Sequence, residues 1–191
     1  MAQHVARRGW VVFVVVFVVV VGAVGTGVLL RDLRPPAGAG GVGSTGSQAP
    51  PRPPEPGPAV VVLTEDVMLH PDADRIHRVL QKYFDAINAG DYQLWRTAVT
   101  PQWARDVGEG AWHGLYRSTL DGSIVVHRLE PRVGGGLVAL TSFTSLQNPV
   151  DAPPGLPVRC LRWWVSYPLI GEGDQLRLAT SSPSANLRVP C

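Results

Sequence analysis

Cysteine is scarce in this chain, and the short motifs that mark many enzymes and metal sites are missing. The 191 residues include two cysteines and five histidines. There is no C-x-x-C, H-E-x-x-H, G-x-S-x-G or Walker lysine, and no N-x-S/T sequon. The five histidines are His4, His70, His77, His113 and His127. They share no metal-ligand spacing, so we expect no metal and no cofactor. These absences exclude the enzyme classes that such motifs identify.

A clustered positive charge is also lacking. From Ala59 onward the chain carries 12 basic and 13 acidic side chains, a formal net charge of −1. A nucleic-acid-binding domain should instead show a basic face or stripe. The sequence therefore predicts no nucleic-acid partner.

One long uncharged hydrophobic run, residues 10–30, lies near the N-terminus. At about 1.5 Å per residue it would form a helix roughly 31 Å long, which matches the hydrocarbon core of a bilayer. We expect a single-pass protein of the cell membrane, with residues 1–9 as a cytoplasmic tail and residues 10–30 as a transmembrane helix in contact with lipid. A cleavable signal peptide is the alternative, because residues 11–21 resemble an h-region and Gly22-Ala23 offers small residues for cleavage.

Residues 31–58 are predicted to be an extracytoplasmic linker, followed by a folded domain over residues 59–191. Residues 35–58 hold 8 prolines and 6 glycines and almost no large apolar side chain, so they cannot form a core. The even cysteine pair, Cys160 and Cys191, suits an oxidising compartment. A disulfide between them would close a loop of about 32 residues and contribute roughly 3.5 to 4 kcal/mol. Two unpaired thiols are the alternative.

The first part of the predicted domain has helical periodicity. Apolar residues recur at positions 76, 79, 80, 83, 84 and 87, and Gly90 ends the pattern. This spacing predicts an amphipathic helix. A second helix is expected after Asp91, and a third is expected to begin at Thr100-Pro101, because threonine suits the N-cap and proline the first helical position.

The periodicity becomes that of strands beyond Asp121-Gly122. Residues 123–132, 137–147, 158–167 and 175–180 are rich in valine, leucine, threonine and aromatics, which favours strands. The connections are short, as in an antiparallel meander. Helices followed by strands predict an α+β fold. Residues 160–167 carry apolar bulk on both faces, so we expect helices on one face and a partner on the other.

Four segments of the domain resemble the nuclear transport factor two-like superfamily, the cystatin-like cones. They are residues 83–92 (YFDAINAGDY), 116–121 (YRSTLD), 143–147 (FTSLQ) and 160–163 (CLRW). The later segments are similar to membrane-anchored actinobacterial members that end in cysteine. The resemblance covers residues 70–191 and implies N-terminal helices packed on a strongly curved antiparallel sheet. It implies no activity, because one fold serves many functions in this superfamily.

The cone expected from the resemblance would bring aromatic side chains around one cavity. We expect Tyr83, Trp95, Trp103 and His127 to line it, although tryptophan also serves as ordinary core. Asp85 or Asp91 is then a candidate base. The leading hypothesis is an extracytoplasmic, non-catalytic binding or assembly domain that recognises a protein, a lipid or an envelope component, or forms a homo-oligomer. A small pocket enzyme of the isomerase or cyclase type is the alternative.

Overall fold

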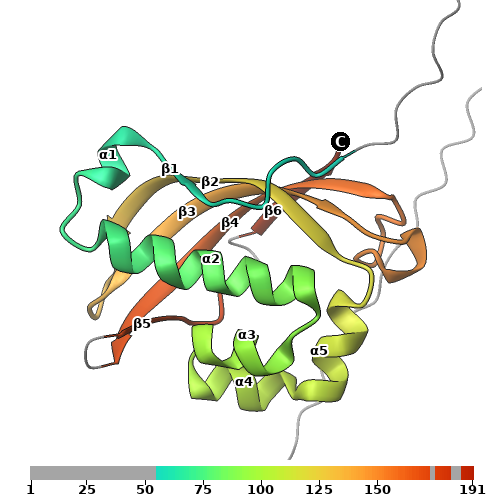
Figure 1. The fold of residues 1–191 in the computed structure, drawn as a ribbon, viewed down its shortest axis with the longest axis horizontal. Helices are drawn as coiled ribbons and strands as arrows, with labels where there is room; N and C mark the ends of the chain where they lie inside the picture. The colour runs from blue at the N-terminus through green and yellow to red at the C-terminus, as the bar shows by residue number, and fades with distance from the viewer. Residues whose placement is uncertain (1–54, 173–174, 182–185) are drawn as a thin grey trace, which may run out of the picture. The chain divides into compact units, whose positions relative to one another are not determined.

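The computed structural model describes residues 55–172, 175–181 and 186–191 (Figure 1). The predicted cytoplasmic tail, the predicted transmembrane helix and most of the predicted linker lie outside the described residues. Among the helices that are described, none combines the length and the apolar composition needed to cross a membrane.

The longest helix, α2 (Ala73–Ala89), follows the predicted periodicity. Its buried side chains include Ile76, Leu80, Phe84 and Ile87, which lie on one face. The helix ends at Gly90, whose φ of 65° lies in the left-handed region that glycine adopts without a steric penalty. The predicted helix is therefore confirmed, and a one-turn helix, α1 (Glu65–Met68), precedes it.

Three short helices follow α2: α3 (Tyr92–Ala98), α4 (Pro101–Val107) and α5 (Glu109–Tyr116). The Asp91 carboxylate caps α3 by accepting a hydrogen bond from the Leu94 amide at 2.8 Å. The Thr100 hydroxyl accepts from the Trp103 amide at 3.3 Å and caps α4. The two predicted short helices are confirmed. The sequence did not predict α5, because glycines interrupt its short apolar pattern.

The strands form one sheet of mixed direction. They are β1 (Val62–Leu63), β2 (Leu120–Pro131), β3 (Leu137–Leu146), β4 (Cys160–Glu172), β5 (Gln175–Leu178) and β6 (Asn186–Pro190). The order is β1-β2-β3-β4-β5, and β6 also pairs with β4. All pairs are antiparallel except β1 with β2. The predicted meander of four strands is confirmed, whereas β1 and β6 are additions.

The sheet is strongly curled into a half-barrel that arches over α2 (Figure 1). Two register shifts interrupt the pairing of β2 with β3, and the first includes Ser123 at a φ of 51°. Such bulges bend a strand and increase its twist. At the other edge, β4 pairs with β5 over residues 169–172 and with β6 over residues 161–165. The curl places α2 to α5 on the concave face, so the mixed α+β architecture is as predicted.

A segment N-terminal to Ala59 belongs to the described fold. The Pro58 carbonyl accepts a hydrogen bond from the Ser123 amide at 2.8 Å. Gly122 lies so close to Pro56 and Gly57 that an added Cβ would meet their carbonyl oxygens. The last residues of the predicted linker therefore pack along β2.

The two cysteines form a disulfide between the start of β4 and the C-terminus, with Cα atoms 5.4 Å apart. The Cys191 amide also donates to the Cys160 carbonyl at 3.2 Å. This bond holds β6 against β4, so the predicted pairing of the two thiols is confirmed.

The convex face of the sheet carries apolar side chains that the described residues leave uncovered. Trp164, Leu187 and Val189 are 39%, 61% and 38% exposed. Trp164 and Leu187 are register partners on β4 and β6. The apolar bulk on both faces of β4 is therefore confirmed, while a protein partner or a homo-oligomer at the convex face stays a prediction.

Candidate functional site: a cavity on the concave face

A cavity of about 530 Å³ opens between the concave face of the sheet and helices α2, α4 and α5. Most of its wall is aromatic or aliphatic: Tyr83, Ile87, Trp103, Leu115, Tyr116, Phe143, Trp163, Val165 and Tyr167. Polar side chains also line it: Thr119, Asp121, Ser145, Gln147, Asp151, Ser181, Asn186 and Arg188. An apolar cleft with a small number of polar groups is the usual form of a small-molecule site.

Asp121 is the buried acid of the cavity, with 4% of its surface exposed. Asn88 on α2 positions it: the Asn88 Oδ1 accepts from the Asp121 amide at 2.7 Å, and the Asn88 Nδ2 donates to the Asp121 carbonyl at 2.9 Å. Burial raises the pKa of the Asp121 carboxyl from 3.8 to about 7, although a hydrogen bond donated by the Ser145 hydroxyl opposes that rise. Asp121 therefore exchanges a proton near neutral pH.

Three tyrosines surround the same part of the cavity. The hydroxyls of Tyr83 on α2 and Tyr116 at the end of α5 are 3.5 Å apart. The rings of Tyr83 and Tyr167 are 5.5 Å apart. Burial is the largest cause that raises the pKa of each of these phenols, and the charge of Asp121 adds to it. The phenols therefore stay protonated and can donate hydrogen bonds to a ligand.

A row of three side chains crosses the sheet in the wall of the cavity, next to the pair formed by Asp121 and Ser145. Phe143 on β3 and Arg188 on β6 are both register partners of Trp163 on β4. The Phe143 and Trp163 rings are nearly parallel, with centroids 6.0 Å apart. The Arg188 Cζ lies 5.4 Å from the centroid of the Trp163 ring, in a cation–π contact. The cavity thus has an acid on β2 and a cation on β6.

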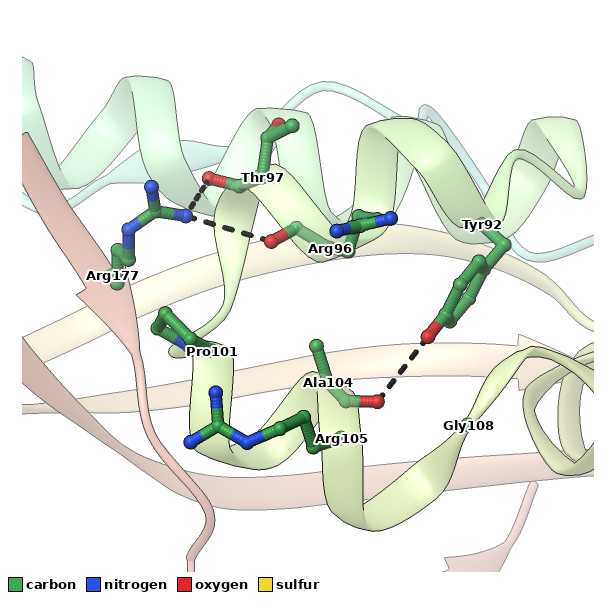
Figure 2. A pocket seen from close by; sticks show the side chains of 8 residues that line it. All are labelled: Tyr92, Arg96, Thr97, Pro101, Ala104, Arg105, Gly108 and Arg177. Atoms are coloured by element: carbon green, nitrogen blue, oxygen red, sulfur yellow. Dashed lines mark hydrogen bonds between the residues drawn. The ribbon is translucent and has the colours of Figure 1, made fainter.

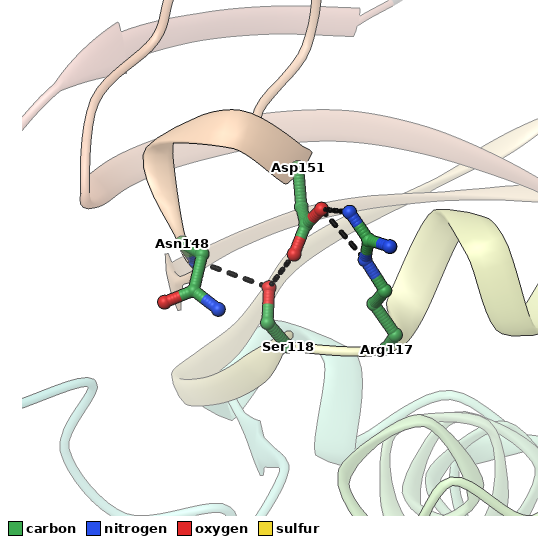
Figure 3. Close-up of polar contacts among 4 residues, drawn as sticks. All are labelled: Arg117, Ser118, Asn148 and Asp151. Carbon is green, nitrogen blue, oxygen red and sulfur yellow. Dashed lines mark hydrogen bonds and ion pairs between the residues drawn. The ribbon is translucent and has the colours of Figure 1, made fainter.

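A polar clasp at the mouth of the cavity joins the end of α5 to the 3-10 helix η1 (Pro149–Asp151). Figure 3 shows Arg117 and Ser118 converging on Asp151. The Arg117 Nε donates to Asp151 Oδ1 at 2.7 Å, and the Ser118 hydroxyl donates to Asp151 Oδ2 at 2.7 Å. The hydrogen bond from Arg117 is the main cause that lowers the pKa of Asp151. Because Asp151 also lines the cavity, the clasp fixes one side of its opening.

The predicted pocket residues do not all meet in this cavity. Tyr83 and Trp103 line it, with ring centroids 6.0 Å apart. Trp95 lies fully buried behind Trp103, at 5.5 Å between ring centroids. His127 lies in a separate depression, where its Nε2 is 2.7 Å from the Ser142 hydroxyl. Trp95 therefore belongs to the core, and His127 lies away from the cavity.

Neither of the two predicted candidate bases lies in the cavity. Asp85 lies on the exposed side of α2, and its Oδ1 accepts a hydrogen bond from the Gln81 side-chain Nε2 at 2.8 Å. Asp91 caps α3. Asp121, the acid that does line the cavity, was placed only at the point where the strand periodicity begins and was not among the predicted site residues. Asp121 is the second residue of β2, just before the predicted strand at residues 123–132, and this position was the signal available.

A second hollow, of about 460 Å³, lies where β5 meets α3 and α4 (Figure 2). Arg96, Arg105 and Arg177 surround it. The Arg177 Nη1 donates to the Thr97 carbonyl at 2.8 Å and to the Val99 carbonyl at 3.2 Å. Arg177 thereby fastens β5 to the end of α3, so its hydrogen bonds at this hollow are structural.

Within the described part of the chain, no three histidine, cysteine, aspartate or glutamate side chains are grouped so that they could hold a metal ion. No family model, curated protein or solved structure matches the chain. The assignment of the concave cavity as the candidate site therefore depends on its geometry.

Proposed function

We propose that this chain is a single-pass, membrane-anchored protein whose extracytoplasmic domain binds a small, largely apolar molecule. Three sequence features support the placement: the uncharged run at residues 10–30, the linker rich in proline and glycine, and the cysteine pair. A linker of this composition gives the domain reach from the bilayer. The role is a non-catalytic one of binding an envelope component such as a lipid.

We also propose that the domain is a cystatin-like cone of the nuclear transport factor two-like superfamily. The segment at residues 83–92, which carries the resemblance, forms the end of α2 and the start of α3. The curl of the sheet over α2 supports this proposal, because the superfamily places its long helix on the concave face.

One observation carries the binding function: the cavity of about 530 Å³ joins an aromatic wall to a few buried polar groups. Apolar surface drives a ligand into such a cavity, and the polar groups orient it. Asp121 and the three phenols supply hydrogen-bonding groups at one end. The proposed ligand is therefore amphipathic rather than purely hydrocarbon.

Binding is tested with the neutral fluorophore N-phenyl-1-naphthylamine and the full chain in phosphatidylcholine nanodiscs, after subtraction of the empty-disc signal. Ala152 lines the cavity, so Ala152→Trp should fill its mouth and abolish the saturable signal. Val150 lies in η1, which Ala152 follows, is 84% exposed and does not line the cavity, so Val150→Trp is the matched control. An unchanged signal in Ala152→Trp would refute binding in this cavity.

A second candidate function is proton transfer by a pocket enzyme of the isomerase or cyclase type. Asp121 supports it, because a general base is most effective when its pKa lies near the working pH. Asp121 replaces Asp85 and Asp91 as the candidate base. The phenols beside it are placed to stabilise a developing oxyanion.

The probe for this second function is 5-nitrobenzisoxazole. A base removes its ring proton, the C–H electron pair forms a nitrile, and the N–O bond breaks to release a phenolate. The second candidate predicts a rate that rises with pH through about 7 and disappears in Asp121→Asn. If the wild-type rate equals that of Asp121→Asn at every pH, the second candidate is refuted and binding is left as the proposed function.

A further inference from the structure

Two hydrogen-bond donors at the β6 end of the cavity have no acceptor among the described residues. They are the Trp163 indole Nε1 and the Arg188 Nε, and both atoms are shielded from solvent. A buried donor without an acceptor destabilises the fold, and more so when the group is charged. A ligand or an ordered water can supply the acceptor for such a donor.

Arg188, the cation at this end, has no counterion among the described residues. None of the ion pairs among the described residues includes Arg188. Its contact is with the face of Trp163, which orients the guanidinium without neutralising its charge. A favourable environment for an anion therefore exists beside the aromatic wall.

The two carboxylates of the cavity are engaged elsewhere. Asp151 is bound by Arg117 and Ser118. Asp121 accepts from Ser145, and it lies on β2, three strand spacings from β6. No ion pair among the described residues joins either of them to Arg188. Neither carboxylate is therefore placed as the partner of Arg188.

We propose that the ligand of the cavity is an amphipathic carboxylate whose head group binds Arg188 and Trp163 and whose apolar body lies along Phe143 and Tyr83. This inference rests on the proposed binding function and specifies the class of ligand. The planar fork of a guanidinium matches the two oxygens of a carboxylate, and the neighbouring indole N–H supplies a further donor. The aromatic wall then buries the apolar part.

The test is displacement of N-phenyl-1-naphthylamine from the full chain in nanodiscs by decanoate and by decanol, a pair that differs only in the head group. Decanoate should displace the fluorophore at a lower concentration than decanol. Arg188→Gln should weaken decanoate by about tenfold or more while leaving decanol within about twofold. Trp163→Phe keeps an aromatic ring but removes the indole N–H. It should weaken decanoate binding by a smaller factor than Arg188→Gln does, and leave decanol binding unchanged.

Arg162→Gln is the matched control for charge. Arg162 is the neighbour of Trp163 on β4, its side chain is exposed, and it does not line the cavity. Equal loss of decanoate affinity in Arg162→Gln, or equal weakening of decanoate and decanol in Arg188→Gln, would overturn the carboxylate assignment. If the fluorophore binds but shows no preference for decanoate, only this inference fails. If it does not bind in a manner sensitive to Ala152→Trp, the proposed function fails as well.

Discussion

Replacing Asp121 with asparagine should stabilise the domain, and the gain should increase with pH. Burial raises the pKa of this carboxyl to about 7, so the folded state holds its proton more tightly than the unfolded chain does. The resulting stabilisation is fully present below about pH 3.8 and is lost as the pH rises through about 7. Asparagine keeps a neutral side chain at every pH and can still accept from Ser145.

The magnitude follows from the distance between the two pKa values. A rise from 3.8 to about 7 corresponds to about 4 kcal/mol at 1.36 kcal/mol per pH unit. Roughly a third of this stability loss has already occurred at about pH 5, because the carboxyl of the unfolded chain is largely ionised there while that of the folded domain is protonated. The stability advantage of Asp121→Asn should therefore grow by about 3 kcal/mol between about pH 5 and about pH 9.

Urea unfolding of the full chain, followed by tryptophan fluorescence at several pH values, measures this difference. Asp85→Asn is the control, because Asp85 lies on the exposed side of α2. Ser145→Ala provides a second check: loss of the hydroxyl removes the hydrogen bond that lowers the pKa of Asp121, so its carboxyl titration, followed by NMR, should move upward. A stability difference between Asp121→Asn and the wild type that does not vary with pH would refute the reasoning.

Two further predictions concern stability. Replacing Cys160 and Cys191 together with serine should lower the free energy of unfolding by about 4 kcal/mol, measured by urea unfolding, because the disulfide closes a long loop; an unchanged value would show that the bond does not form in solution. Gly122→Ala should destabilise the domain by about 1 to 3 kcal/mol, because its Cβ would lie 2.8 Å from a backbone carbonyl oxygen. Gly110→Ala in the first turn of α5 is the control, because its Cβ meets no atom within 4 Å and should not destabilise the domain; destabilisation of similar size in both variants would contradict this account.

Local signals were sufficient for much of the fold. The apolar spacing of α2, the caps at Asp91 and Thr100 and the alternation in β3 are each determined within a few residues. The disulfide followed from there being only two cysteines. Strand β6 was missed because residues 186–190 carry little strand signal of their own, and the pairing with β4 and the bond at Cys191 hold them in place.

The site was harder to predict because it depends on curvature. Trp95 and Trp103 are eight residues apart on neighbouring helices, and only the packing decides that Trp103 meets the cavity while Trp95 is buried behind it. The register of β2 places Asp121 opposite Ser145, and no short pattern encodes that pairing. His127 follows the fully buried Val126 on β2, and because side chains alternate along a strand it points to the opposite face.

The central claim is that the concave cavity holds a small molecule, and mass spectrometry tests it most directly. The full chain is purified from membranes, extracted with organic solvent, and compared with Ala152→Trp and Val150→Trp prepared in the same way. We predict one dominant molecule in roughly equimolar amount with the wild type and with Val150→Trp, and its loss from Ala152→Trp. The same molecules in the same amounts from all three proteins would contradict the claim.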